Sequence, residues 1–250
     1  MPVYIVEDMP VSLRDKVVLV VGASSGIGRA TAQMFAAEGA QVMAAARRAN
    51  RLAELREELE AAGHPIEIHA CDASSAAEME KLAKLTFEKF GKIDFMVYVS
   101  GTNVQNRALS RLNVETWDKM INVNLSGAYY ITQAVLPAMR HAKSGYLMYV
   151  SSISGLMPDV SGAAYQAAKR GLVGFAHAIR VEEKENGIRT CAICPGLVDT
   201  EILENRPVKP SAETMALAMQ SEDIAEAILA VAKLPERAVV PEFQILPTYL

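Results

Sequence analysis

The stretch VLVVGASSGIGRATAQMFAAEG, from Val18 to Gly39, decides the fold of this chain. It opens with an apolar run that is too short for a helix of its own. A turn with glycines at positions 22, 26 and 28 comes next, and a helical pattern then runs to Gly39. This order predicts a buried strand, a tight turn and a helix that packs back onto the strand.

The spacing of the glycines, Gly-x-x-x-Gly-x-Gly, is a variant of the dinucleotide-binding fingerprint. Gly22 allows a sharp reversal, Gly26 lets backbone amides approach a diphosphate, and Gly28 lets the helix pack against the sheet. The free amides at the start of a helix stabilise an anion. Similar turns occur in proteins that bind nothing, so the turn alone leaves both interpretations open. The residues predicted to contact the cofactor here are Gly22, Ser24, Ser25, Gly26, Ile27 and Gly28.

Length and composition predict one globular domain over residues 16–250, after a polar and loosely attached lead-in over residues 1–15. The chain has 250 residues, of which 51% are hydrophobic and 22% charged, and its formal net charge is −4. Acidic and basic residues are interspersed, so we expect neither a nucleic-acid partner nor a membrane-binding patch. Without a long apolar run or a secretory signal pattern, the expected location is the cytoplasm.

The three cysteines, Cys71, Cys191 and Cys194, are expected to be small buried core residues. Cys191 and Cys194 have CxxC spacing, but they lie in an apparent strand, where an odd offset sends side chains to opposite faces. Because no second Cys or His pair completes a zinc site, we expect no metal.

Strand and helix patterns alternate along the whole chain. The predicted strands are 16–21, 40–46, 65–72, 93–101, 145–152, 188–196 and 238–246, the last one an edge strand because of Pro241. The predicted helices after the first are 47–63, 75–90, 114–141 with a possible bend at Pro137, 162–186 and 221–233, while 198–220 is less regular. This alternation predicts an α/β, Rossmann-type, doubly wound and mainly parallel seven-stranded sheet.

The end of the second predicted strand bears on the choice of cofactor. An acidic residue is expected there if the ribose carries a free 2′-hydroxyl, but this position is Ala46, followed by Arg47 and Arg48. A guanidinium can bind a 2′-phosphate through paired hydrogen bonds, so the residues favour NADP(H) over NAD(H). The alternative is that both arginines begin a solvated helix face. Asp72 could accept a hydrogen bond from adenine or could cap a turn, and the sequence does not decide between these roles.

The candidate catalytic pair is Tyr165 and Lys169, one turn apart on the same face of a predicted helix. A nearby cation is expected to lower the high pKa of a phenol. Ser152, at the end of the fifth predicted strand, could donate to a substrate oxygen, because ligands bind at the carboxyl ends of parallel strands. Asn124 could hold a water behind Lys169, although a turn serine and a satisfied buried amide explain Ser152 and Asn124 equally well.

Taken together, the motifs VGASSGIG, INVNLSG, YVSSISG, YQAAK and PGLVDT resemble, in this order, the short-chain dehydrogenase/reductase family in its compact single-domain form. The resemblance covers residues 14–247. It implies hydride transfer between the nicotinamide and a carbonyl or alcohol carbon, with Tyr165 as general acid/base and Ser152 on the substrate oxygen. Lys169 would bind the nicotinamide ribose and Asn124 would support a proton relay. The further cofactor contacts implied are Gly101, Pro195, Gly196, Val198 and Thr200.

Two departures from the family pattern concern the rigidity of the cofactor loop. Val21 stands where the family usually has Thr, so a hydroxyl that ties the loop is missing. The family segment Asn-Asn-Ala-Gly appears as Tyr98–Gly101, so an asparagine that braces the central strands is also missing.

The motifs leave the substrate open. An apolar wall of Leu156, Met157, Ile202 and Leu203 would suit a modest ketone or alcohol, a 3-oxoacyl thioester or a 3-hydroxy acid. The family resemblance implies a homodimer or homotetramer, and the apolar length of helix 162–179 permits this. Two other classes stay open: a non-catalytic NADP-binding regulator that senses redox state, and an epimerase or dehydratase. The latter usually needs a larger C-terminal domain than the residues after Gly196 provide.

Overall fold

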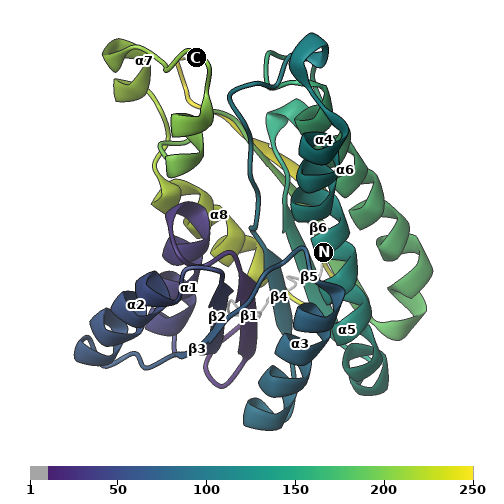
Figure 1. The fold of residues 1–250 in the computed structure, drawn as a ribbon. Helices are drawn as coiled ribbons and strands as arrows, with labels where there is room; N and C mark the ends of the chain where they lie inside the picture. The colour runs from purple at the N-terminus through teal and green to yellow at the C-terminus, as the bar shows by residue number, and fades with distance from the viewer. Residues whose placement is uncertain (1–10, 250) are drawn as a thin grey trace, which may run out of the picture.

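Seven short runs rich in Val, Ile, Leu and Ala form the strands of one parallel sheet. The computed structural model describes residues 11–249, and its strands follow the order β3-β2-β1-β4-β5-β6-β7, every neighbouring pair parallel (Figure 1). This confirms the predicted Rossmann-type sheet. The strands are β1 (Val17–Val21), β2 (Gln41–Ala46), β3 (Glu67–Ala70), β4 (Phe95–Tyr98), β5 (Gly145–Val150), β6 (Ile188–Pro195) and β7 (Glu242–Ile245), the last at the edge as Pro241 predicts.

Helices cover both faces of the sheet, because successive strand residues point to opposite sides. Val18 and Val20 pack with α1 (Gly26–Ala37), α2 (Ala49–Ala61) and α8 (Ser221–Ala232). Leu19 and Val21 pack with α3 (Ala76–Phe90), α5 (Gly127–Ala142) and α6 (Ala163–Glu183). Figure 1 shows these two layers on either side of the strands.

The buried cysteines follow the same alternation. Cys191 belongs to the core on the α1 side and Cys194 to the core on the α5 side, and both thiols are free. Burial raises the pKa of both to about 12, so they stay protonated. The expectation of core cysteines on opposite faces of one strand is confirmed.

The predicted lead-in differs from expectation within the described residues. Leu13 is buried in the core beside α1, and the Val11 amide donates to the Lys233 carbonyl at 3.0 Å. Residues 11–15 are therefore packed onto the domain rather than loosely attached. The remainder of the predicted lead-in, residues 1–10, lies outside the described residues.

Several predicted strands are shorter in the structure, and two predicted segments need a larger correction. The helix expected over 114–141 is divided into α4 (Val114–Ile121), a π-helical segment η2 (Asn122–Ser126) and α5. Strand β5 ends at Val150, so Ser152 lies beyond it, at the start of the 3-10 turn η3 (Ile153–Gly155). The less regular segment contains the 3-10 helix η5 (Glu201–Asn205) and the short helix α7 (Ala212–Ala216).

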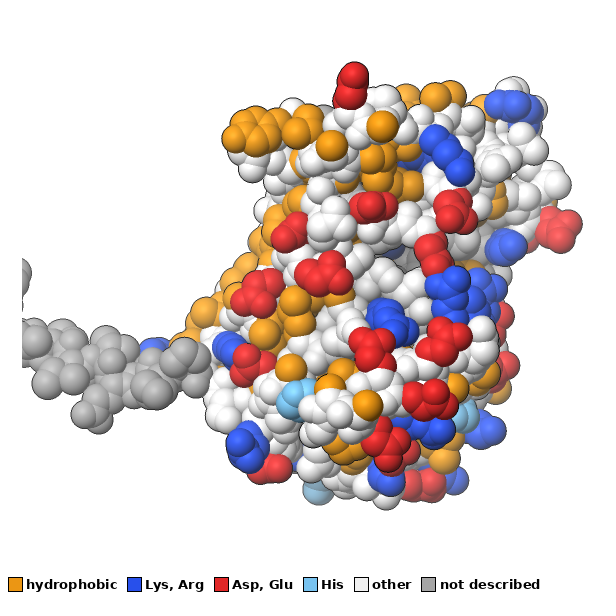
Figure 2. All heavy atoms as spheres, turned by 90° about the vertical axis from the view of Figure 1, so that its left-hand side faces the viewer, with side chains coloured by type: hydrophobic (Ala, Val, Ile, Leu, Met, Phe, Trp, Pro, Cys, Tyr) orange, Lys and Arg blue, Asp and Glu red, His pale blue; other side chains and the backbone are white. Residues whose placement is uncertain are grey.

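Because the strands are parallel, their carboxyl ends meet at one edge, and the loops that follow them lie together there. Figure 1 shows η5 and α7 on one side of this edge and α4 on the other. On the face in Figure 2, Lys and Arg side chains are mixed with Asp and Glu rather than gathered into one patch. No helix within residues 11–249 is long and apolar enough to cross a membrane.

Candidate active site

A cavity of about 720 Å³ opens at the carboxyl ends of β1, β2, β4, β5 and β6. This volume is typical of small-molecule and cofactor sites. Its lining contains most of the residues that the sequence singled out: Gly22, Ser24, Ser25, Gly26, Ile27, Arg47, Arg48, Asp72, Gly101, Ser152, Tyr165, Lys169, Pro195, Gly196, Val198 and Thr200. Gly28 and Asn124 do not line the cavity, but each supports the backbone of residues that do.

The glycine-rich turn is fixed by close backbone approaches. Gly22 has a φ of +106°, and a Cβ there would lie 2.6 Å from the Ser100 amide nitrogen. A Cβ on Gly28 would collide with the Gly22 carbonyl, so Gly28 is needed for the first turn of the helix to pack against the start of the loop. The sequence instead predicted that Gly28 contacts the sheet. The amides of Gly22 and Ala23 both donate to Ala45 O, at 2.7 and 3.0 Å. These bonds hold the loop without the missing hydroxyl at Val21.

Arg48 connects this turn to the segment after β6. Its guanidinium donates to Ser24 Oγ at 3.0 and 3.1 Å and to Ser25 Oγ at 2.6 Å, and it pairs with Glu201 at 2.7 Å. Glu201 also pairs with Arg51, a residue the sequence did not single out. These two guanidiniums hold the pKa of Glu201 below its usual range.

Arg47 and Asp72 line the cavity near this cluster. Arg47 is exposed. Asp72 accepts from the Ser74 amide and hydroxyl at 2.9 and 2.8 Å. Burial opposes ionisation of Asp72, but the Ser74 bonds and the charge of Arg47 outweigh it and lower the pKa of the carboxyl. Asp72 therefore caps its turn and faces the cavity at the same time.

Tyr165 and Lys169 lie one turn apart on α6, with the Lys169 Nζ 5.6 Å from the Tyr165 ring centroid. Lys169 is only 3% exposed and donates to the Val150 carbonyl at 2.9 Å. Burial lowers the pKa of Lys169 to about 8. No carboxylate pairs with this ammonium within the part of the chain that the structure describes.

The pKa of Tyr165 departs from the expected direction. Burial raises it to about 12, and a hydrogen bond from Ser152 and the charges of Arg206 and Arg107 only partly offset this rise. The expected lowering of this pKa by Lys169 is wrong: burial of the phenol sets the direction, and the cations that act on the phenol are Arg206 and Arg107. The Ser152 hydroxyl also accepts from the Ser154 amide at 3.2 Å and caps η3.

Asn124 is fully buried in the π-helical segment, and protein groups satisfy both hydrogens of its amide. Its Nδ2 donates to the Thr102 and Met120 carbonyls, and its Oδ1 accepts from the Thr102 amide. A Cβ on Gly101 would lie 3.1 Å from the Asn124 Oδ1 and 3.4 Å from the Lys169 Nζ. Asn124 therefore braces the Gly101–Thr102 backbone beside Lys169, which agrees with the satisfied-amide interpretation.

Tyr98 stands where the family has an asparagine that braces the central strands, and its hydroxyl provides a different brace. Its buried hydroxyl donates to the Val123 carbonyl at 2.6 Å, and this bond ties β4 to the π-helical segment. A Cβ on Gly127 would collide with the same hydroxyl, so glycine at that position makes room for Tyr98. The Val99 and Ser100 amides both donate to Val21 O and complete the link to β1.

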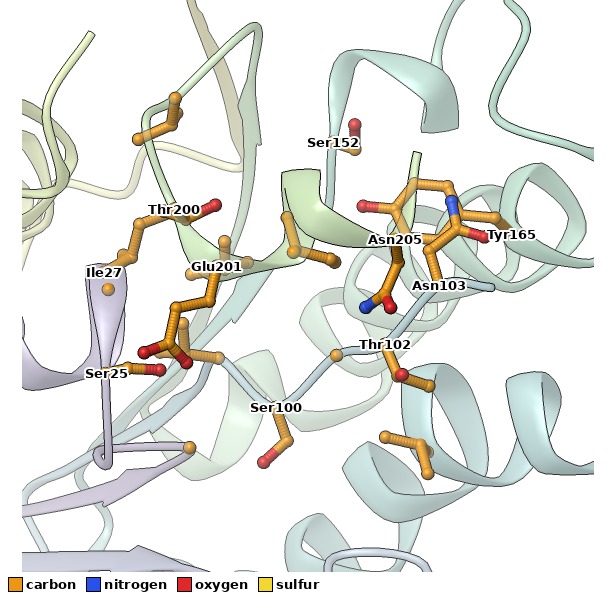
Figure 3. Close-up of a pocket in the computed structure, with 18 of the residues that line it drawn as sticks. Ser25, Ile27, Ser100, Thr102, Asn103, Ser152, Tyr165, Thr200, Glu201 and Asn205 are labelled. Atoms are coloured by element: carbon orange, nitrogen blue, oxygen red, sulfur yellow. The ribbon is translucent and has the colours of Figure 1, made fainter. Parts of the chain in front are cut away.

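The region beyond Ser152 and Tyr165 is more polar than the sequence suggested. Ile202 and Leu203 line it, but Leu156 and Met157 do not. Figure 3 shows Asn103 and Asn205 beside Tyr165. Sequence reasoning missed these residues because Asn103 lies on a loop and Asn205 ends a short 3-10 helix, where no periodicity indicates the direction of a side chain. The other polar residues it missed in this lining include Arg107, Asp159, Ser161 and Arg206.

A nicotinamide dinucleotide fits the groups that this cavity presents. Ser25 is the N-cap of α1 but makes no side-chain cap, so this residue leaves the first amides of the helix free to bind a diphosphate. The Lys169 ammonium has one protein acceptor for three hydrogens, which leaves donors for ribose hydroxyls. Within residues 11–249 no cluster of three or more His, Cys, Asp or Glu could hold a metal ion.

Comparison with known proteins agrees with this geometry. The short chain dehydrogenase family model matches residues 16–210. An uncharacterized oxidoreductase of Listeria monocytogenes is 32% identical over 244 residues, which are 95% of this chain and 98% of the relative. A metagenomic short-chain oxidoreductase in complex with NADP has 30% identity and a TM-score of 0.83, covering 96% of this chain and 100% of that one.

The closed form of a serine dehydrogenase complexed with NADP+ shares 30% identity and has a TM-score of 0.84, covering 92% of this chain and 94% of that one. The family match spans the glycine-rich turn, the π-helical segment and the Tyr165–Lys169 pair, all of which meet at the one cavity. The chain therefore belongs to the short-chain dehydrogenase family and is an oxidoreductase that works with a nicotinamide cofactor.

Proposed function

We propose that this protein is an NADP(H)-dependent carbonyl reductase or secondary-alcohol dehydrogenase. The observation that carries the proposal is the convergence of Ser152, Tyr165 and Lys169 on the cavity that also contains the glycine-rich turn. A hydroxyl donor, a proton-exchanging phenol and a buried ammonium are the groups that reduction of a carbonyl requires. The serine dehydrogenase among the similar structures bears a name that makes a 3-hydroxy acid one reasonable substrate type.

Each residue of the site would have a separate role, set by the substrate or cofactor atom that it can contact. When bound, the cofactor supplies hydride to the carbonyl carbon or accepts it from the alcohol carbon. In the reductive direction, Ser152 donates a hydrogen bond to the oxygen as it gains negative charge, and Tyr165 gives that oxygen its proton. In the oxidative direction Tyr165 takes the proton back. A pKa of about 12 keeps Tyr165 protonated at neutral pH, which suits a proton donor.

Lys169 and the backbone at Gly101 would hold the nicotinamide ribose, and the Asn124 amide keeps that backbone in place. Pro195, Gly196, Val198 and Thr200 line the cavity beyond the end of β6, where the carboxamide would lie. A proton relay through Asn124 would need a water beside Lys169, since both amide hydrogens of Asn124 are already donated to carbonyls.

Preference for NADP(H) rests on Arg47 and Arg48, where an acidic residue would serve a free 2′-hydroxyl. The structure adds Arg51, which approaches the same carboxylate as Arg48. Glu201 forms ion pairs with the guanidinium groups of Arg48 and Arg51, which could otherwise bind a phosphate. A bound 2′-phosphate would therefore displace the Glu201 carboxylate from them. The segment η5, which carries Glu201, would then be coupled to the cofactor.

The cofactor assignment is tested with the variants R47Q and R48Q and with the double variant. We expect each single variant to lower the NADPH-over-NADH preference in kcat/KM by about tenfold or more and the double variant by about 100-fold or more, since each charge-assisted pair contributes roughly 1.5–3 kcal/mol. R56Q, an exposed arginine on α2 outside the cavity, is the matched control and should leave the preference unchanged. An unchanged preference in the double variant would reject the assignment.

The activity is tested by NADPH oxidation with a panel of ketones, oxo acids and acetoacetyl thioesters. We expect turnover by the wild-type protein and a loss of at least 1,000-fold in kcat for Y165F, of the order found when a general acid is removed. Binding of NADPH to Y165F, followed by nicotinamide fluorescence, should stay within about twofold. A protein that binds NADPH but reduces nothing in the panel would instead fit a non-catalytic regulator.

Assembly, domain structure and location complete the proposal. Trp117 on α4 and Tyr129 on α5 are large and partly exposed, and they favour a homo-oligomer that covers these helices. Light scattering after gel filtration tests this directly: a mass of two or four chains of 27.1 kDa is expected. We also propose a cytoplasmic location and one domain over residues 16–250, onto which residues 11–15 pack.

A further inference from the structure

Two arginines stand in the wall of the cavity beyond Ser152 and Tyr165. Arg107 follows β4, and Arg206 comes directly after η5. Both side chains are half-buried. Neither guanidinium has an ion pair or a side-chain hydrogen bond to any other residue within 11–249. Their N–H donors are therefore available to an acceptor that enters the cavity.

Backbone packing fixes Arg107 beside the phenol of Tyr165. Gly162, which has a φ of +93°, begins α6, and a Cβ on it would lie 2.8 Å from both Cβ and O of Arg107. The Asn103 amide donates to the Ser161 carbonyl at 3.2 Å and ties the same two segments together. Tyr165 follows in the first turn of α6, so the loop that carries Arg107 is packed against the start of the catalytic helix.

Arg206 approaches the same place from the opposite wall. It follows Asn205, whose side chain lies beside Asn103 and Tyr165 in Figure 3. Arg107 and Arg206 each act electrostatically on Tyr165, and they repel one another enough to help lower the pKa of Arg107, after the larger effect of burial. Both positive charges therefore act on the part of the cavity that contains the Tyr165 hydroxyl.

No acidic residue within 11–249 forms an ion pair with either arginine, and two of the three that line the cavity nearby are engaged elsewhere. Asp159 accepts from the hydroxyl of Ser154 at 2.5 Å and from the amide and hydroxyl of Ser161 at 2.8 and 3.0 Å. It is not within ion-pair distance of either arginine, although its charge acts on Arg107. Glu201 is paired with Arg48 and Arg51, and Glu204 is exposed.

We propose that the substrate is a carbonyl compound or alcohol that carries a carboxylate, and that Arg107 and Arg206 bind this carboxylate while Ser152 and Tyr165 hold the reacting oxygen. The planar guanidinium matches a carboxylate through two parallel hydrogen bonds. The inference rests on the proposed function and narrows its substrate class to short oxo acids and hydroxy acids.

The test compares each oxo acid with its neutral methyl ester or amide, and with a phosphate-bearing ketone of similar length. The wild-type protein should show a higher kcat/KM for the acid than for its neutral partner. In R107M and R206M the kcat/KM for the acid should fall roughly tenfold to 100-fold, mainly through KM, and the kcat/KM for the neutral partner should fall much less, through kcat alone, because both charges also act on Tyr165. R111M replaces an exposed arginine outside the cavity and is the matched control.

Thermal unfolding and the NADPH dissociation constant of each variant show that fold and cofactor site are intact. Neutral ketones turned over as well as acids, with R107M and R206M unchanged, would overturn the inference and leave the proposed function standing. Preference for the phosphate-bearing ketone would also overturn it, in favour of a phosphate ligand. A lack of turnover on every compound, with NADPH bound, would overturn the proposed function itself.

Discussion

At the scale of single residues, burial sets the chemistry of the catalytic pair. It raises the pKa of Tyr165 to about 12 and lowers that of Lys169 to about 8, so burial shifts both groups toward their neutral forms, while Lys169 stays mostly protonated at neutral pH. The sequence predicted that the two side chains share a helix face, and they do. It could not predict the pKa of either, because neither burial nor the positions of Arg107 and Arg206 can be read from the spacing of two residues.

The low pKa of Lys169 predicts a dependence of stability on pH. The unfolded chain binds the proton up to a pKa near 10.5 but the folded chain only up to about 8, so the free energy of unfolding contributed by Lys169 rises with pH between these values. Over the whole range the rise amounts to ~3 kcal/mol.

This prediction is measured as the difference in unfolding free energy between the wild-type protein and K169M, by denaturant titration from pH 7 to pH 10.5. The unfolding free energy of the wild-type protein should increase relative to that of K169M as the pH rises. Parallel profiles for the two proteins would show that the buried ammonium has an ordinary pKa.

At the scale of elements, the π-helical segment between α4 and α5 positions Asn124. The periodicity of residues 114–141 predicted one continuous helix, because a single π-turn changes the direction of the apolar stripe too little to be seen in sequence. Tyr98 on β4 holds this segment by its bond to the Val123 carbonyl. From the sequence, Tyr98 indicated the loss of an asparagine that braces the central strands in the family. In the structure its hydroxyl instead links β4 to the π-helical segment.

Removing the Tyr98 hydroxyl in Y98F should leave the buried Val123 carbonyl without this partner. The expected cost is about 1–2 kcal/mol in the free energy of unfolding, or ~2–8 °C in Tm for a chain of this size. We also expect a lower kcat, because the segment that carries Asn124 loses its tie to β4.

Y149F is the matched control for this variant. Tyr149 is an equally buried tyrosine on β5, and its hydroxyl is bonded to Thr132 on α5, away from the π-helical segment. It should lower Tm by a similar amount without changing kcat. Equal kcat values for Y98F and the wild-type protein would mean that the tie is structural only.

At the scale of the whole molecule, parallel strands bring distant parts of the chain to one edge. The parallel sheet, the glycine-rich turn and the shared helix face of Tyr165 and Lys169 could be predicted, because strand–helix alternation and residue spacing indicate them. Arg107, Glu201 and Arg206 could not, since each depends on how a loop packs against another loop. The expected apolar wall at Leu156 and Met157 failed for the same reason.

The central claim is that this cavity transfers hydride between a nicotinamide and a carbonyl carbon with Tyr165 as the proton donor. The most direct measurement uses NADPH deuterated at both C4 positions and mass spectrometry of the alcohol product from the oxo acids and ketones above. The account predicts one deuterium on the new carbinol carbon with the wild-type protein and almost none with Y165F, which still binds NADPH. Deuterium transfer by Y165F at the wild-type rate, or none by the NADPH-bound wild-type protein on any of these compounds, would contradict it.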